Sequence, residues 1–250
     1  MDSRGVKLST RIARLRPTER LSHVTAARIL GVPLPRDADT RTHISAPTGA
    51  SHSRGHGIVG HRDDGETLVV DGMRVSAPEH LFLELARELR LDDLVAVGDH
   101  LIHVPRFAVA HRPWTTLGAL RAATVGPHRR VRLARLALEL VRHGVESPQE
   151  TRLRLLLGRA GLPAPECGYR VDGSDGRTIG WFDLAWPRHR VLGEYDGDQH
   201  RTSAEQYDKD IRRFDHAADD DWRVIRVRAA GLRGTGRDET VARFMRALRR

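Results

Sequence analysis

The 250-residue sequence is poor in cysteine, lysine, aromatic residues and long apolar runs. Cys167 is its only cysteine, which excludes an intramolecular disulfide and a cysteine-rich zinc site. The absence of a G-x-x-x-x-G-K-[ST] loop leaves ATP-driven chemistry and a nucleotide cofactor without support. No apolar run approaches the ~20 residues that cross a bilayer, and no apolar stretch follows the N-terminus as in a signal peptide. These absences predict a cytoplasmic protein that has no membrane partner.

Positive charge dominates the chain. The formal net charge is +9 and the isoelectric point is near 10.8. Lysine occurs only as Lys7 and Lys209, so the basic residues are almost all arginine. Such a chain attracts polyanions such as DNA, and the arginine fork matches phosphate well. Arginine also accumulates throughout proteins from GC-rich genomes, so the charge favours a DNA partner without establishing one.

The length and the apolar pattern predict two α/β (α+β) parts. A smaller α+β module is expected over residues 1–110, followed by a linker and a basic helix over 111–146. In the module, the predicted helices are 22–31, 78–89 and 91–103, and the predicted strands are 42–45, 57–61, 67–70 and 73–75.

Residues 147–250 are expected to form a compact second domain, a mixed sheet flanked by helices. Pro148 begins its first helix, at a position where the missing N–H costs nothing. The runs 179–186 and 190–196 are joined by a short turn and should pair as a hairpin. A helix over 203–220, a strand over 222–228 and a last helix complete the domain.

Carboxylates gather around this hairpin. Strand side chains alternate between faces, so Glu194 and Asp196 point the same way, and the hairpin brings Asp183 close to Glu194. Carboxylates that converge at the edge of an apolar sheet repel each other unless a cation lies between them. Oxygen ligands suit Mg²⁺ or Mn²⁺, and such sites assist hydrolysis, most often of phosphodiesters. His200 follows closely and offers an imidazole for proton transfer.

This ordered series resembles the PD-(D/E)XK nuclease superfamily, and more narrowly its branch similar to very-short-patch-repair endonucleases. The matching segments, within roughly 145–235, are Glu146–Arg154, Gly161–Pro163, Asp183–Pro187, Glu194–His200, Asp210–Arg213 and Trp222–Val227. The resemblance implies a restriction-endonuclease-like core over 147–250 and a catalytic set made of Glu150, Asp183, Glu194, Asp196 and His200. It also implies that Mg²⁺ or Mn²⁺ is held by Asp183, Glu194, Asp196 and the carbonyl of Tyr195. Arg212 and Arg213 would contact DNA phosphates.

Several of these residues also have a structural interpretation. Asp196 stands where many members of the superfamily carry the lysine of an E-x-K motif, and it could instead cap the turn at Gly197. The remaining alternatives are a turn residue for Asp183, an exposed loop residue for His200, a helix acid for Glu150 and an ion pair with Asp210 for Arg213.

The first half resembles the N-terminal region of proteins related to AbiEi-type antitoxins. The matching segments are Ser22–Ala27, the strands before Ser76–Pro78, and Asp93–Asp99. Little chain precedes Ser22, so this module is expected to lack a complete winged helix.

The remaining histidines and paired aspartates look like solvated loop residues. His52, His56 and His61 lie in a Gly/Ser-rich stretch without regular ligand spacing, and Asp63 and Asp64 follow directly.

The sequence supports two classes of function. The first is a metal-dependent DNA endonuclease or nickase. The second is a DNA-binding regulator of the antitoxin type that carries a catalytically silent nuclease fold.

Overall fold

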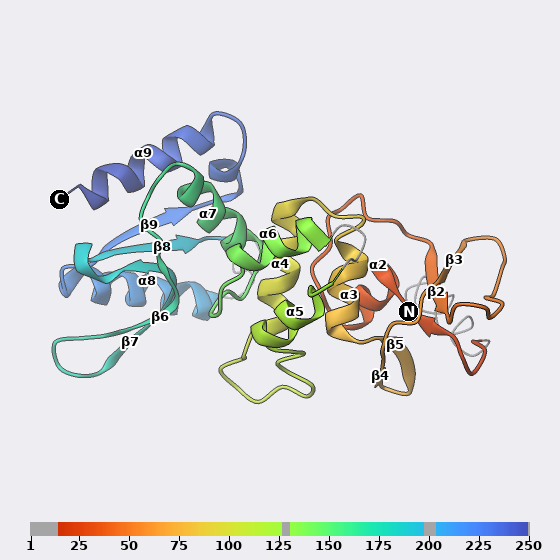
Figure 1. The fold of residues 1–250 in the computed structure, drawn as a ribbon. Helices are drawn as coiled ribbons and strands as arrows, with labels where there is room; N and C mark the ends of the chain where they lie inside the picture. Colours follow the sequence, from red (N-terminus) through yellow and green to blue (C-terminus); the bar gives the residue numbers. More distant parts are fainter. Residues whose placement is uncertain (1–14, 127–130, 198–203, 250) are drawn as a thin grey trace. The chain divides into compact units, whose positions relative to one another are not determined.

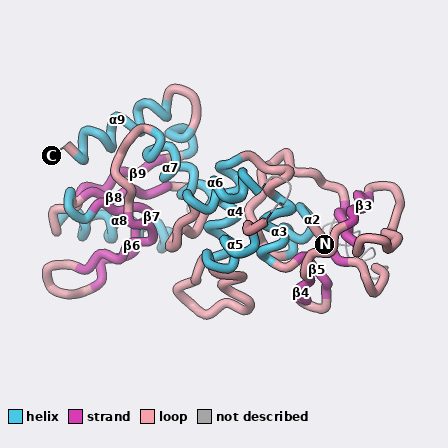
Figure 2. The backbone as a smooth tube through the Cα atoms, viewed as in Figure 1, coloured by secondary structure: helices cyan, strands magenta, loops and turns pink. Residues whose placement is uncertain are grey.

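The computed structural model describes residues 15–126, 131–197 and 204–249. For residues 204–209 it describes the backbone alone. The chain divides into two compact units, Met1–Val141 and Arg142–Arg250. Each unit contains helices and one mixed β-sheet, which confirms the α+β class (Figures 1 and 2).

The N-terminal unit is built around a five-stranded sheet in the order β3-β2-β1-β5-β4. Parallel pairing joins β2 to β3 and β1 to β5, and antiparallel pairing joins the other neighbours. The strands are β1 (Arg20–Leu21), β2 (Thr42–Ala46), β3 (Ile58–Arg62), β4 (Thr67–Val70) and β5 (Met73–Ser76). The helices are α2 (His23–Ile29), α3 (Pro78–Leu85), α4 (Leu91–Ile102), α5 (Leu117–Ala123) and α6 (Val131–Leu140).

Apolar side chains from the strands and helices form one core in this unit. Leu21, Ile44 and Val75 from the sheet are buried, as are Leu81 and Phe82 from α3. Helices α5 and α6 lie in the segment expected as a linker and a basic helix, and they pack against α3 and α4. The unit therefore extends to Val141.

The C-terminal unit contains a four-stranded sheet in the order β6-β7-β8-β9. Its elements are α7 (Pro148–Arg159), β6 (Glu166–Asp172), β7 (Thr178–Trp186), η1 (Pro187–His189), β8 (Val191–Tyr195), α8 (Ala204–Asp219), β9 (Arg223–Val227), η3 (Ala229–Leu232) and α9 (Gly236–Leu248). The predicted hairpin is confirmed, because β7 and β8 pair antiparallel with Leu184 opposite Gly193. Strand β9 then adds in parallel beside β8.

Two apolar clusters cover the two faces of this sheet. Helix α8 lies on one face and helices α7 and α9 on the other (Figure 1). Leu184 packs in the cluster under α7 and α9, whereas Phe182 and Leu192 pack in the cluster under α8. Because Phe182 and Leu184 face opposite sides, the regular alternation of side chains breaks at Asp183. The break falls where β7 begins to separate from β8.

None of the helices in the described part of the chain is long and apolar enough to cross a membrane.

Candidate metal centre in the C-terminal unit

Asp183 and Glu194 lie opposite each other, one step beyond the last paired residues of β7 and β8. The backbone N–H of Asp183 donates to Glu194 Oε2 at 3.3 Å. The backbone N–H of Tyr195 donates to Asp183 Oδ2 at 2.6 Å. Each carboxylate thus accepts from the neighbouring strand, where a backbone ladder would otherwise continue. The hairpin fixes the two acids side by side, as the pairing of the two runs predicted.

The surroundings of this pair disfavour negative charge. Burial raises the pKa of Asp183 well above its ordinary value, and the charges of Glu194 and Glu150 raise it further. Burial also raises the pKa of Glu194, although its contact with Arg213 opposes that shift. The Glu194 side chain is only 12% exposed. A bound cation would offset both the cost of burying the charged carboxylates and the repulsion between them.

Glu150 has the structural role of a helix acid and also lies in the electrostatic surroundings of the Asp183–Glu194 pair. It occupies the third position of α7, where its N–H donates to the Ser147 hydroxyl at 3.2 Å. Its own carboxylate accepts from the N–H of Glu146 at 2.9 Å, so the two side chains cap the helix start. Burial raises the pKa of Glu150, and the charges of Glu146 and Glu194 add to the shift. The acid therefore caps α7 and also belongs to the electrostatic group around Asp183.

Arg213 supplies the positive charge at the centre. Its Nη2 lies 2.5 Å from Glu194 Oε1 and 3.6 Å from Asp210 Oδ1. Its Nη1 donates to the carbonyl of Trp181, and its guanidinium lies over the Phe182 ring at 4.8 Å. The buried Nε–H has no hydrogen-bond acceptor among the described residues. The ion pair with Asp210 is therefore present, and Arg213 also reaches Glu194, while its contact with phosphate stays a prediction.

Glycine at position 180 leaves room for this arginine. A Cβ atom on Gly180 would lie 2.5 Å from Cδ and 2.9 Å from Cγ of Arg213. The arginine stem therefore passes directly over the backbone of β7.

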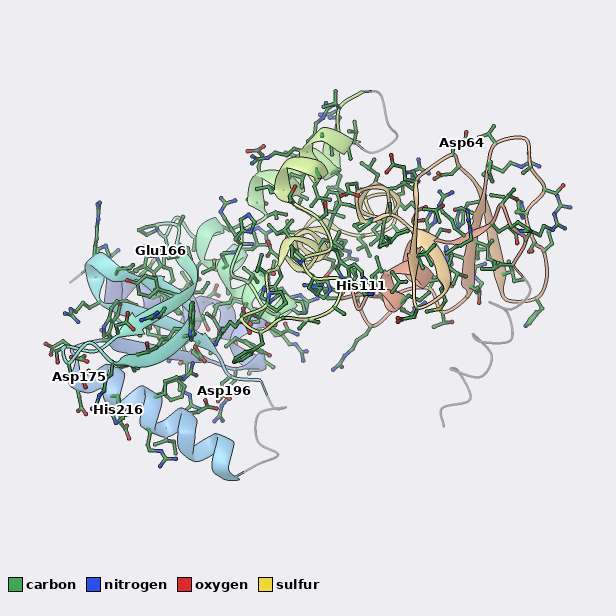
Figure 3. The ribbon with its side chains drawn as sticks, turned by 90° about the horizontal axis from the view of Figure 1, so that it is seen from below. Asp64, His111, Glu166, Asp175, Asp196 and His216 are labelled. Atoms are coloured by element: carbon green, nitrogen blue, oxygen red, sulfur yellow. The ribbon has the colours of Figure 1, made fainter. Side chains whose placement is uncertain are left out.

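Asp196 is held by arginines. Its carboxylate lies 2.9 Å from Arg226 Nη2 and 3.2 Å from Arg228 Nε. It follows β8 directly, at the point where the chain runs into the undescribed residues 198–203 (Figure 3). These three residues and Arg243 help line a pocket of about 320 Å³. Two guanidinium groups already offset the charge of Asp196, and this argues against Asp196 as a metal ligand.

The other predicted site residues are placed as follows. Tyr195 contributes its N–H to Asp183. Arg212 is exposed, next to Arg213 on α8. His200 lies outside the described residues.

The neighbouring carboxylates of Asp183 and Glu194 fit a hard divalent cation, and Glu150 acts on Asp183 electrostatically. All three offer carboxylate oxygens, the ligands that Mg²⁺ and Mn²⁺ prefer. The charge of Glu194 raises the pKa of both Asp183 and Glu150, and the charge of Glu150 raises that of Asp183, an electrostatic strain that a cation would offset. Arg213 lies where it can offset the charge of Glu194 in the absence of a metal.

Two expectations about the N-terminal unit were wrong. His61 does not lie in a solvated loop: it is part of strand β3, and its Nε2 lies 3.0 Å from His43 Nδ1. Asp63 is not a solvated charge, because it pairs with Arg20 at 2.6 Å and with His80 at 2.7 Å. These partners are distant in the sequence, so spacing could not have indicated them.

Comparison with known proteins provides no functional assignment. No family model matches the chain. It is similar to two uncharacterized proteins of Mycobacterium tuberculosis, MT2308 from strain CDC 1551 and Rv2248 from strain H37Rv. Each is 27% identical over 173 residues, which cover 68% of this chain and 61% of the relative. The match thus spans less than two thirds of the length of these relatives.

Proposed function

We propose that the protein is a Mg²⁺- or Mn²⁺-dependent DNA endonuclease or nickase, acting in the cytoplasm and related to the PD-(D/E)XK superfamily. The observation that carries the proposal is the half-buried Asp183–Glu194 pair, held by reciprocal backbone hydrogen bonds. Burial raises the pKa of both acids, and the charge of Glu194 raises that of Asp183 further. Structural acids in a sheet rarely need such a destabilising arrangement. Perturbed carboxylates that converge in this way are typical of functional sites.

The roles of the residues follow from their contacts. Asp183 and Glu194 would hold the cation, and Glu150, whose charge acts on Asp183, would orient water beside it. A bound divalent ion supplies a Lewis acid that activates water and offsets the charge that develops on the phosphodiester. Arg213 would exchange Glu194 for a phosphate oxygen, a change that its unpartnered Nε–H favours. Asp196 would order Arg226 and Arg228 beside the DNA backbone.

A second function is favoured by one specific observation. Arg213 already provides a cation to Glu194, and Arg226 and Arg228 provide two to Asp196. A regulator of the antitoxin type could keep these ion pairs as fixed structure and bind DNA without cutting it.

Plasmid nicking distinguishes the two functions. The purified protein should nick supercoiled DNA with Mg²⁺ or Mn²⁺ and not with EDTA. Asp183→Asn should abolish nicking, whereas Asp175→Asn, in the exposed β6–β7 turn, should leave it intact. Inactivity on duplex, mismatched and single-stranded DNA, with DNA binding retained, would favour the regulator.

A further inference from the structure

Three histidines from three elements meet in the N-terminal unit. His23 begins α2, His43 lies in β2 and His61 lies in β3. One ring nitrogen from each can be chosen such that all three lie within 4.8 Å of one another. His61 Nε2 and His43 Nδ1 are 3.0 Å apart, and the rings of His23 and His61 stack at 3.7 Å. Fold topology, rather than chain spacing, produces this cluster.

Glu88 places a carboxylate oxygen beside the histidines. Its Oε1 lies 3.9 Å from His23 Nε2 and 3.9 Å from His43 Nδ1. Glu88 therefore approaches two of the three rings, and His61 Nε2 is the hydrogen-bonding neighbour of His43 Nδ1. Zinc bonds of about 2.0–2.1 Å in a tetrahedron separate the ligand atoms by roughly 3.4 Å. The separations of 3.0 and 3.9 Å lie on either side of that value.

Oxygen atoms contact the outer nitrogens of two of the rings. His23 Nδ1 lies 3.1 Å from the Ser22 hydroxyl, and His43 Nε2 lies 3.2 Å from Asp39 Oδ2. Only the Ser22 contact has hydrogen-bond geometry, because His43 Nε2 makes no hydrogen bond among the described residues. In metal-binding histidines an oxygen on the far nitrogen fixes the tautomer and the ring orientation, and His23 has that arrangement. The inner nitrogens His23 Nε2 and His43 Nδ1 are then the ones that face Glu88. The Ser22 contact is independent of the clustering itself and points to the same ligand atom of His23.

Burial keeps the three rings neutral. Burial, together with the charges of neighbouring histidines, lowers the pKa of His23 to about 2 and that of His61 to about 4. Burial also lowers the pKa of His43. Near neutral pH the rings therefore offer lone pairs, the form that binds metal.

A neighbouring group with similar residues contrasts with this one. Asp63, His80 and Glu84 also bring three ligand atoms together. Arg20 already supplies their cation, with Nη2 2.6 Å from Asp63 and 3.6 Å from Glu84. The histidine cluster has no such arginine contact among the described interactions.

We propose that His23, His43 and His61, with Glu88 as fourth ligand, form a Zn²⁺ site that ties α2, β2 and β3 to the turn after α3. Imidazole nitrogens select a borderline transition metal over Mg²⁺, so this site is distinct from the carboxylate centre of the other unit. A ligand bond lies in the plane of its ring, so one of the stacked rings, His23 or His61, turns about χ2 when the metal binds. The site stabilises the N-terminal unit and does not depend on the proposed nuclease function.

Metal titration of the full-length protein tests this proposal. After removal of metal with a chelator, calorimetry with Zn²⁺ should show one tight site and a higher Tm on binding. Co²⁺ in its place should give the intense visible absorption of a tetrahedral complex. His61→Asn should weaken Zn²⁺ binding on the order of 100-fold and remove the absorption, and Glu88→Gln should weaken it on the order of 10-fold.

Two control variants show whether a loss of Zn²⁺ binding is specific to the histidine cluster and independent of nicking. His189→Asn, an exposed residue of the C-terminal unit, should bind Zn²⁺ like the wild type. Asp183→Asn should keep Zn²⁺ binding even if nicking is lost, so the two proposals fail separately. If His61→Asn does not fold, Glu88→Gln carries the test, because that side chain is 28% exposed. Wild-type protein without a tight site, or a folded His61→Asn or Glu88→Gln protein that binds as tightly as the wild type, would overturn the proposal.

Discussion

Asp183 and Glu194 accept hydrogen bonds across the same hairpin in opposite directions. The Asp183 N–H donates to Glu194, and the N–H that follows Glu194 donates to Asp183. The backbone thereby holds two buried acids beside each other although their charges repel. This relationship connects the stability of the domain to the chemistry that we propose for it.

Neutral isosteres at these positions should separate activity from stability. Asp183→Asn and Glu194→Gln keep the shape but remove the charge that would hold a cation, so nicking should fall at least 100-fold, about 2.7 kcal/mol in the barrier. The metal-free protein should become more stable, by on the order of 1 kcal/mol for each unit by which the acid's pKa is raised. Denaturant unfolding in EDTA measures the second effect. Variants that retain full activity would refute the nuclease mechanism.

The raised pKa values predict how stability depends on pH. In the unfolded chain Asp183 and Glu194 titrate near 3.8 and 4.5, and burial raises both pKa values in the folded protein. Between the unfolded and folded values the folded protein holds more protons, so its free energy of unfolding falls as pH rises. The contribution from these acids is fully present below about pH 4 and lost as pH rises through the folded pKa values.

The contribution of the two acids is obtained by subtracting the stability of the double variant Asp183→Asn/Glu194→Gln from that of the wild type at each pH. The buried histidines, whose pKa values are lowered, give the opposite slope in wild type and variant alike. We therefore expect the wild type, relative to Asp183→Asn/Glu194→Gln, to lose stability from pH 4 toward neutrality in EDTA. Mg²⁺ should remove that difference in slope. Parallel profiles in EDTA would show that the two acids do not titrate abnormally.

Adjacent arginines on α8 provide a matched pair of variants. Arg213→Ala leaves the buried Glu194 without its ion pair, so the metal-free protein should lose on the order of 1–3 kcal/mol of stability. Arg212→Ala removes an exposed side chain and should change stability by less than about 0.5 kcal/mol. Mg²⁺ should restore much of the loss in Arg213→Ala. Equal effects of the two substitutions on unfolding in EDTA would contradict this role for Arg213.

Gly180 offers a way to displace Arg213 without removing it. In Gly180→Ala the new methyl group would lie 2.5 Å from Arg213 Cδ, so the guanidinium must leave its place beside Glu194. Nicking and metal-free stability should both fall, as in Arg213→Ala. Gly158→Ala is the control, since its methyl group meets no atom within 4 Å and should stabilise helix α7 by roughly 0.5–1 kcal/mol. The unfolding curves of the two variants should shift in opposite directions.

The sequence predicted the centre of the C-terminal unit well because its signals are local. Two strand-like runs joined by a short turn are enough to place Asp183 opposite Glu194, and Ser147 and Pro148 mark the start of α7. The involvement of Asp196 with Arg226 and Arg228 was not foreseen, because β9 reaches β8 only after a long helical connection. Parallel neighbours leave no register signal in a single sequence.

The same reason explains the wrong expectation for His61. Its neighbour in the cluster, His43, lies on a strand that pairs in parallel with β3, while the Gly/Ser-rich composition before residue 57 indicated a loop. Chain distance conceals such contacts even when each strand is recognised.

A diffraction experiment on crystals soaked in Mn²⁺ tests the central claim most directly. We predict an anomalous difference peak between the carboxylates of Asp183 and Glu194, at about 2.1 Å from an oxygen of each, with Arg213 moved away from Glu194. The peak should be absent from Asp183→Asn crystals treated in the same way. A wild-type crystal at saturating Mn²⁺ with no peak there, and with Arg213 still bound to Glu194, would contradict the account.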